Sequence, residues 1–231
     1  MRDNEIQAAW HGLASCEQCG IRDLVLFADL TNEDFSVIHL PIEDIWLAPG
    51  AALYQAGQTS AALFTVREGL LKLEQYLPDG TQRIVSLLKQ GDVAGLESTV
   101  ANIYEHTAIA LQPTKVCKIP REVVSRLSPK LHRQLMNKWY DVLQRSQECT
   151  RELSTGSARQ RIARLFLLLA PPCSENCRLF TREDIGALLG ITTQTASRMV
   201  ADFKRIGAVT ETAPNIFRRD ITRLEEIASQ E

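Results

Sequence analysis

The sequence predicts an α+β protein in which a β-rich N-terminal domain is joined by one long helix to a helical C-terminal domain. Three observations lead to this prediction. Short apolar runs alternate with glycine turns over residues 42–120, apolar residues recur every three or four positions over residues 131–153, and residues 181–209 read as two helices separated by a glycine. A chain of 231 residues is long enough for each domain to bury a core of its own.

Composition and charge are those of a globular protein whose positive charge lies toward the C-terminus. Hydrophobic residues make up 45% of the chain and charged residues 23%, which excludes a wholly disordered chain. The net charge is -2, yet residues 154–231 hold 11 Lys and Arg against 9 Asp and Glu. We find no apolar run near the about 20 residues of a membrane span, no signal peptide and no regular cysteine framework. We therefore expect a cytoplasmic protein that does not bind a membrane.

The β-rich part is predicted from short apolar runs bounded by glycine turns at the spacing of a sandwich or barrel. The predicted strands are residues 42–47, 62–67, 70–77, 82–88, 106–111 and 115–119. Pro78, Asp79 and Gly80 stand between two of these strands. Because glycine supplies the positive φ of tight turns, we expect a hairpin there.

One long helix is predicted after Pro120, because an apolar stripe steps by threes and fours with almost no helix breaker. A narrow stripe over about three heptads is typical of a two-helix coiled coil, so we expect this helix to form a homodimer. Packing of the stripe on the chain's own β-domain is the alternative. The expected interface residues are Leu131, Leu135, Trp139, Val142, Cys149 and Leu153.

The segment from Ser154 to Ser157 interrupts the helical pattern and predicts a hinge near Gly156. Ser157 is a plausible N-cap for the helix that follows. The predicted domains are residues 1–127 for the β-rich domain, 128–154 for the dimerisation helix and 155–231 for the C-terminal domain.

The stretch of the sequence that says most about function is predicted to form two capped helices separated by Gly190. Thr181 is expected to cap the first helix and to form a capping box with Asp184, and Thr192 to cap the second. The second helix has one apolar face, formed by Ala196, Met199, Val200 and Phe203. This pattern predicts a helix-turn-helix, in which the domain core holds one face of the second helix while the other enters the major groove.

The opposite face of the second helix carries side chains that suit DNA. Arg can pair with guanine and Gln with adenine through two hydrogen bonds, while Ser, Thr and a helix N-terminus suit phosphates. A helical hairpin with a merely solvated polar face is the alternative. The expected DNA-binding residues are Thr192, Thr193, Gln194, Thr195, Ser197 and Arg198.

The β-rich domain, the long helix and the segment ITTQTASRMVADFKRIG together resemble the Crp/Fnr superfamily of bacterial transcription factors. The resemblance covers nearly the whole chain. It implies a β-roll like that of cyclic-nucleotide-binding domains, a winged helix-turn-helix, and a homodimer that reads a two-fold symmetric DNA operator and works with RNA polymerase. Many members carry Glu where this chain has Gln194, so we expect a different base preference there. No phosphate-binding, nucleophile-elbow or zinc-protease motif is found, so no catalysis is expected.

The resemblance also bears on what the β-roll senses. Cyclic-nucleotide rolls hold the phosphate with a Gly-Glu pair and an Arg, whereas this chain has a displaced Glu97 and the sequence Glu105-His106-Thr107. We therefore do not expect cAMP binding. The iron–sulfur subgroup is matched by Cys16, Cys19 and Cys117, but Val25 stands where a further cysteine would follow.

An iron–sulfur cluster is thus one candidate cofactor, with a fourth ligand from Asp23, His11 or outside the protein. A thiol switch, no cofactor, or haem on His11, His39, His106 or His132 are alternatives, as is zinc on Cys16 and Cys19 with Cys173 and Cys177. We place the Cys173–Cys177 segment in a surface loop. Cys149 could form an intersubunit disulfide or pack in the core. Two further classes stay open, a catalytic protein regulated by the roll and an interaction module that does not bind DNA.

Overall fold

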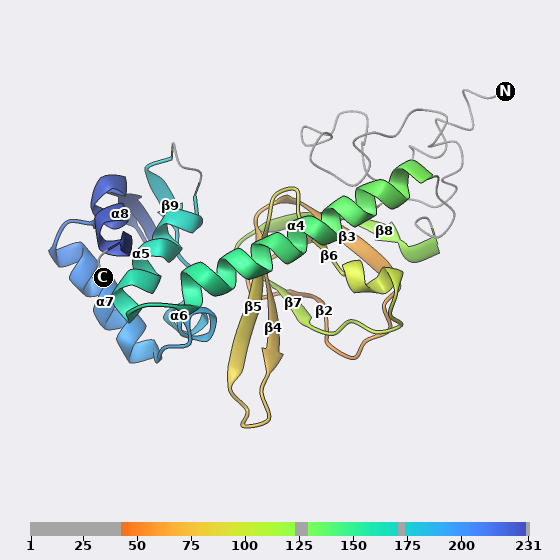
Figure 1. Cartoon of the computed structure of the whole chain (residues 1–231), viewed down its shortest axis with the longest axis horizontal. Helices are drawn as coiled ribbons and strands as arrows, with labels where there is room; N and C mark the ends of the chain where they lie inside the picture. The colour runs from red at the N-terminus through yellow and green to blue at the C-terminus, as the bar shows by residue number, and fades with distance from the viewer. Residues whose placement is uncertain (1–42, 123–128, 171–173, 230–231) are drawn as a thin grey trace. The chain divides into compact units, whose positions relative to one another are not determined.

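The computed structural model describes residues 43–122, 129–170 and 174–229 (Figure 1). The chain forms two compact units. The first runs up to Gln75 and from Val85 to Gln144; the second comprises Tyr76–Ile84 and the chain from Arg145 onward. No helix in the described ranges is both long and apolar enough to cross a bilayer.

The first unit is built on two four-stranded sheets, which confirms the predicted β-roll. One sheet has the order β1-β8-β3-β6 and the other β2-β7-β4-β5. The bounds are β1 Glu43–Leu47, β2 Ala52–Tyr54, β3 Ala62–Glu68, β4 Leu70–Tyr76, β5 Gln82–Lys89, β6 Val93–Ala94, β7 Thr107–Ala110 and β8 Thr114–Pro120, with a 3-10 helix, η3, at Leu96–Thr99. The strands of the first sheet pair antiparallel, as do β2, β7 and β4.

The core of the roll draws side chains from both sheets. Tyr54, Phe64, Val66, Leu71 and Leu88 belong to one cluster of buried residues. Because alternate strand residues point to opposite faces, each sheet contributes one face to this cluster. Burial of that shared face is what holds the two sheets together.

The predicted hairpin between β4 and β5 is confirmed. Leu77 N–H donates to the Thr81 carbonyl at 2.9 Å, Asp79 accepts from the backbone N–H of Thr81 at 2.8 Å, and Gly80 has a φ of 81°. The strands β2 and β6 were not predicted, because runs of three and two residues are too short to show an alternating pattern.

The long helix is α4, Pro129–Ser154, of 26 residues. The second unit contains the last turns of α4, four further helices and a three-stranded sheet of order β10-β11-β9. The bounds are α5 Ala158–Leu168, β9 Asn176–Arg178, α6 Arg182–Leu189, α7 Thr193–Arg205, β10 Val209–Ala213, β11 Ile216–Arg219 and α8 Ile221–Ser229. The sheet is the wing of a winged helix-turn-helix.

Three phenylalanines form the centre of the C-terminal core. The Phe166 ring lies 6.1 Å from that of Phe203 and 5.7 Å from that of Phe217, measured between ring centres. These residues come from α5, α7 and β11, and all three are fully buried. The core therefore ties the second helix of the helix-turn-helix to the wing and to α5.

One predicted cap differs from the structure. Thr181 accepts from the Asp184 N–H at 3.1 Å, but its hydroxyl donates to the Asp184 carboxylate, so the reciprocal bond of a capping box is not made. The Asp side chain is one carbon shorter than the Glu or Gln that reaches back to an N-cap. The full box forms instead at α5, where Gln160 reaches back to Ser157, which sequence reasoning identified only as an N-cap.

Candidate nucleic-acid interface

The turn between α6 and α7 depends on two glycines. Gly190 ends α6 in the left-handed conformation, with φ 64° and ψ 41°, which glycine adopts without steric cost. The sequence analysis predicted the role of Gly190 in this turn but not that of Gly186. A Cβ on Gly186 would lie 2.7 Å from the Ile191 carbonyl oxygen, so the turn packs directly on the α6 backbone. The two helices are thus held at close range.

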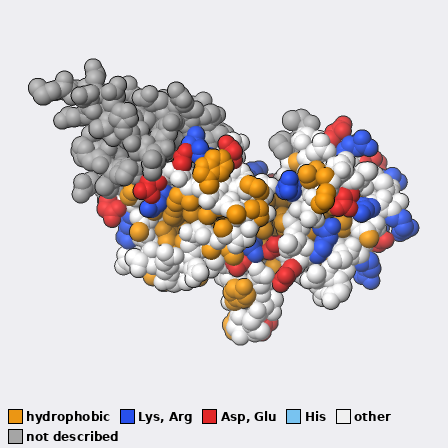
Figure 2. All heavy atoms as spheres, turned by 180° about the vertical axis from the view of Figure 1, so that it is seen from behind, with side chains coloured by type: hydrophobic (Ala, Val, Ile, Leu, Met, Phe, Trp, Pro, Cys, Tyr) orange, Lys and Arg blue, Asp and Glu red, His pale blue; other side chains and the backbone are white. Residues whose placement is uncertain are grey.

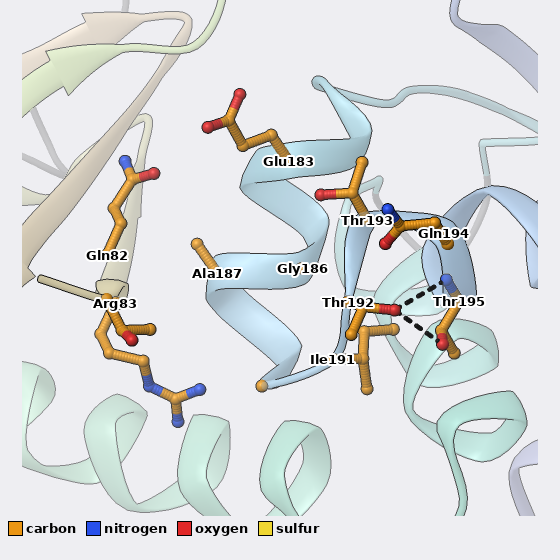
Figure 3. A pocket seen from close by; sticks show the side chains of 12 residues that line it. Gln82, Arg83, Glu183, Gly186, Ala187, Ile191, Thr192, Thr193, Gln194 and Thr195 are labelled. Carbon is orange, nitrogen blue, oxygen red and sulfur yellow. Dashed lines mark hydrogen bonds between the residues drawn. The ribbon is translucent and has the colours of Figure 1, made fainter. Parts of the chain in front are cut away.

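The start of α7 is fixed by Thr192. Its hydroxyl accepts from the Thr195 N–H at 3.1 Å and donates to the Thr195 hydroxyl at 2.9 Å (Figure 3). This N-cap satisfies one of the amide groups that a helix start leaves without an intrahelical partner. Thr192 and Thr195 therefore serve the geometry of α7, whereas the exposed Thr193 and Gln194 are not used in this cap.

The two faces of α7 lie where the sequence predicted them. Ala196, Val200 and Phe203 are buried, with exposed fractions of 0%, 2% and 0%. The predicted base-reading residues Gln194, Ser197 and Arg198 are all exposed. The domain core therefore holds one face of α7 and leaves the polar face open, which is the arrangement a recognition helix requires.

A hollow of about 740 Å³ borders the start of α7 in the second unit (Figure 3). It is lined by the helix-turn-helix and by Thr81, Gln82 and Arg83 at the hairpin tip. Both Thr193 and Gln194 border this space. The first turn of α7 is therefore open on the side that faces this hollow.

The wing supplies positive charge that sequence reasoning did not identify. Arg178 on β9 and Arg218 on β11 are exposed, while Cys177 and Phe217 alternate with them on the buried face. The strand register pairs Ile216 with Arg178, which puts both arginines on one face of the sheet. Figure 2 shows Lys and Arg side chains gathered over the C-terminal unit, at the right of that view. The signal missed in the sequence is the period-two alternation around two short strands.

An ion pair connects α7 to the wing. Lys204 Nζ lies 2.6 Å from Glu211 Oε2, and this hydrogen bond with Lys204 holds the pKa of Glu211 below its ordinary value. Glu211 lies on β10. The end of α7 and the wing are therefore fastened by a charged contact as well as by the aromatic core.

The predicted dimer stripe of α4 is partly used within a single chain. Leu135 is 7% exposed and Leu153 1% exposed, and Trp139, Val142 and Cys149 are half-buried. The side chain of Leu131 lies outside the described residues. A second apolar stripe at a spacing of four and three is open, with Met136 66%, Tyr140 60% and Leu143 55% exposed. The most exposed apolar side chains of α4 in the described residues therefore lie one position along from expected interface residues, and the expected interface itself stays a prediction.

Cys117, the predicted cluster ligand on β8, lies against a charged group. Its Sγ is 3.4 Å from Asp44 Oδ1, and Asp44 also binds Arg67 at 3.0 Å and Lys115 at 2.8 Å. Burial raises the pKa of Asp44, but hydrogen bonds from Lys115, Cys117 and Arg67 outweigh it and leave the pKa below its ordinary value. The other predicted ligands, Cys16 and Cys19, lie outside the described residues.

The two other thiols that the structure describes, those of Cys149 and Cys177, are not prepared for metal binding. Burial raises the pKa of Cys177 to about 11 and also raises the pKa of Cys149, so both stay protonated at neutral pH. Cys177 is 4% exposed on β9, so the expectation of a surface loop was wrong at this position, because the wing sheet buries it. Cys173 lies outside the described residues. Within the described ranges, no three His, Cys, Asp or Glu side chains gather as a metal site.

Two tyrosines, Tyr54 and Tyr104, pack against each other in the roll close to Gly95. The Tyr54 and Tyr104 rings stack at 3.9 Å, and the Tyr104 hydroxyl donates to the Ala62 carbonyl at 2.7 Å. A Cβ at Gly95 would lie 3.0 Å from the Tyr104 ring. The expectation that cAMP does not bind stays a prediction.

Two family models match the chain, the cyclic nucleotide-binding domain over residues 44–129 and the Crp-like helix-turn-helix domain over residues 160–227. The transcriptional activator protein FnrA of Stutzerimonas stutzeri is 30% identical over 84% of this chain and 84% of that protein. The fumarate and nitrate reduction regulatory protein of Vibrio cholerae is 29% identical over 82% of this chain and 80% of that protein.

Solved structures agree on the fold. FixK2 from Bradyrhizobium japonicum matches with a TM-score of 0.73 at 21% identity, over 83% of this chain and 100% of that chain. A CRP-family transcriptional regulator from Thermus thermophilus, TTHB099, matches with a TM-score of 0.71 at 25% identity, over 80% and 97% of the two chains.

Proposed function

Because the chain belongs to the Crp/Fnr family of transcription regulators, we propose that it reads a two-fold symmetric DNA operator with the exposed face of α7. The chain is a DNA-binding transcription regulator and not an enzyme. The proposal rests on one observation above all. Gln194, Ser197 and Arg198 are exposed side by side on a helix whose other face is buried in the domain core.

Each residue of this face has a distinct role in the proposal. Arg198 and Gln194 meet base edges, with guanine and adenine as their preferred partners, and Ser197 adds a further hydrogen bond. Thr192, Thr193 and Thr195 at the helix start lie near a phosphate, where the N-terminal dipole favours negative charge. Arg178 and Arg218 on the wing contact phosphates of the backbone and so extend the site beyond the residues that the sequence predicted.

A dimer presents this face twice, and we propose that α4 forms it. Productive binding requires two recognition helices about 34 Å apart, one turn of DNA. Met136, Tyr140 and Leu143 form the seam, because they are the large apolar side chains left open among the α4 residues whose side chains the structure describes. Leu135 and Leu153 support the same helix from inside the chain. Contact with RNA polymerase completes the proposed mode of action.

Selection of binding sites from random duplex DNA, followed by gel shifts at a stated salt concentration, tests the DNA proposal. A two-fold symmetric consensus is expected, and Arg198→Ala should weaken binding and relax specificity at one base pair per half-site. Arg218→Ala should weaken binding to all sequences alike and reduce the salt dependence. A protein indifferent to every duplex would overturn the proposal.

We propose an oxygen or redox signal for the roll. The supporting observation is the similarity to the Vibrio cholerae protein named for fumarate and nitrate reduction. An iron–sulfur cluster held by Cys16, Cys19 and Cys117 would supply an oxygen-sensitive group, since thiolates are the usual ligands of such clusters. Of these three, the structure describes only Cys117, which is buried on β8 beside Asp44.

The fit of the cluster therefore depends on the two N-terminal cysteines, and the described residues alone do not form its site. Iron and sulfide assays on protein purified without oxygen test this part of the proposal. Wild type should carry both elements, and Cys117→Ser should lose them while keeping its fold. Equal, negligible iron in both proteins would instead favour a thiol-based signal or no cofactor.

A further inference from the structure

We propose that Arg164 of α5 is a positioning residue that fastens the last turn of α4 to the DNA-binding domain. The end of the dimerisation helix and the helix-turn-helix would then move as one body. This inference rests on the proposed DNA-binding function, and it concerns how a dimer keeps its two recognition helices at the spacing an operator requires.

The guanidinium of Arg164 binds backbone carbonyls at the ends of two other helices. Its Nη1 donates to Glu152 at 3.2 Å and to Thr155 at 3.0 Å, where α4 ends. Its Nε and Nη2 donate to Ala228 at 3.3 Å and 3.0 Å, in the last turn of α8. The Glu152 carboxylate adds an ion pair, with Oε2 at 3.7 Å from Nε.

These contacts are the ones a helix end needs. The last carbonyls of a helix have no intrahelical partner, and the helix dipole makes that end negative. The planar guanidinium carries five donors in a fixed fork and can serve both helix ends at once. Because only 20% of the Arg164 side chain is exposed, water competes weakly for these bonds.

Burial and the division of the chain into units also indicate that the end of α4 packs with the DNA-binding domain. Leu153 in the last turn of α4 is 1% exposed. The chain from Arg145 onward, including the end of α4, belongs to the same compact unit as the helix-turn-helix. The end of α4 is therefore packed as part of the DNA-binding domain.

The predicted hinge near Gly156 is better understood as a fixed corner. The Thr155 hydroxyl donates to the Arg151 carbonyl at 2.5 Å, and the Ser157 capping box with Gln160 begins α5. Gly156 turns the chain with a φ of 82°, and a Cβ there would lie 2.7 Å from Gln160 Oε1. A hinge between the two units would accordingly lie within α4, before Arg145, and not at Gly156.

The test compares Arg164→Gln and Arg164→Lys with Arg151→Gln in the full-length dimer. Arg151 contacts the same Glu152 carboxylate, at 3.0 Å, but lies on α4 itself with a side chain 72% exposed, so it makes no link between helices. Lysine keeps the charge of Arg164 but lacks the fork. Both Arg164 variants should therefore behave alike if geometry is what matters.

Two measurements are made on each protein. The first is amide hydrogen exchange over residues 152–156, which should speed up at least tenfold in both Arg164 variants and stay unchanged in Arg151→Gln. The second is affinity for a full operator and for a half-site at one salt concentration. Loosening the junction should weaken operator binding about tenfold, because the second half-site is no longer presented at a fixed spacing. Half-site affinity should stay within about twofold.

Two results would overturn the inference. One is unchanged exchange and operator affinity in both Arg164 variants. The other is an equal loss on half-site and operator, which would mean that Arg164 only stabilises the DNA-binding domain. If wild type binds no DNA at all, the proposed function fails, while the exchange measurement still decides whether Arg164 holds the end of α4.

Discussion

Two leucines of α4 that differ in exposure allow a sharp test of the dimer seam. Leu143 is 55% exposed in the single chain, whereas Leu135 is 7% exposed. Full burial of a leucine side chain contributes about 1.5–3 kcal/mol. If the partner helix covers the open half of Leu143, each chain gains about 1–1.5 kcal/mol from it.

Leu143→Ala should remove most of this gain without disturbing the helix, because alanine is the best helix former. The seam is two-fold symmetric, so each dimer loses the contribution twice, about 2–3 kcal/mol. The dissociation constant of the dimer should rise about 30- to 150-fold. Thermal unfolding of the isolated chain should change little.

Leu135→Ala is the matched control, with the same change on the same helix. Removing a buried leucine costs about 2–5 kcal/mol of unfolding free energy through the cavity left behind. We expect a lower melting temperature and a nearly unchanged dissociation constant. Analytical ultracentrifugation over a concentration series measures the constant, and circular dichroism follows the unfolding. The assignment of the seam would be refuted if Leu135→Ala dissociates the dimer while the Leu143→Ala dimer stays as tight as wild type.

Three further predictions follow from the site and its supports. Gln194→Glu should move the preferred base opposite this position from adenine toward cytosine by about 1–3 kcal/mol, measured by site selection on both proteins, and identical consensus sequences would contradict it. Gly186→Ala should lower the unfolding free energy by about 1–3 kcal/mol in denaturant titrations, since its Cβ would lie 2.7 Å from the Ile191 carbonyl; unchanged stability would show that the turn relaxes. The lowered pKa of Asp44 means that its ionised form stabilises the fold at pH values above about 4 and that this contribution is lost as the pH falls through the folded pKa. Wild type should therefore melt above Asp44→Asn at pH 7, with the difference shrinking below pH about 4, and a constant difference would argue against the ion pairs as its source.

The helix-turn-helix could be predicted from the sequence because its signals are local. Thr192 and Gly190 mark the ends of the helices, and the apolar residues of α7 recur at the helical period. The close approach at Gly186 could not be predicted. It depends on where the Ile191 carbonyl lies in space, and glycine in a helix carries no sign of its neighbour.

The apolar residues of α4 show why spacing alone could not predict which side chains stay exposed. Leu135 and Val142 are seven positions apart, and so are Met136 and Leu143, so the sequence holds two apolar stripes with one period. Which stripe contacts the chain's own domain depends on long-range packing. Within the single chain, the structure buries Leu135 and leaves Leu143 open.

The stacked pair of Tyr54 and Tyr104 has a consequence for how this roll differs from a ligand-dependent one. A domain that needs a small molecule to complete its interior is incomplete without it, and its heat resistance rises with the amount supplied. Here two of the protein's own aromatic rings, both buried, stack on each other inside the roll. We expect the melting temperature to stay unchanged when nucleotides are added.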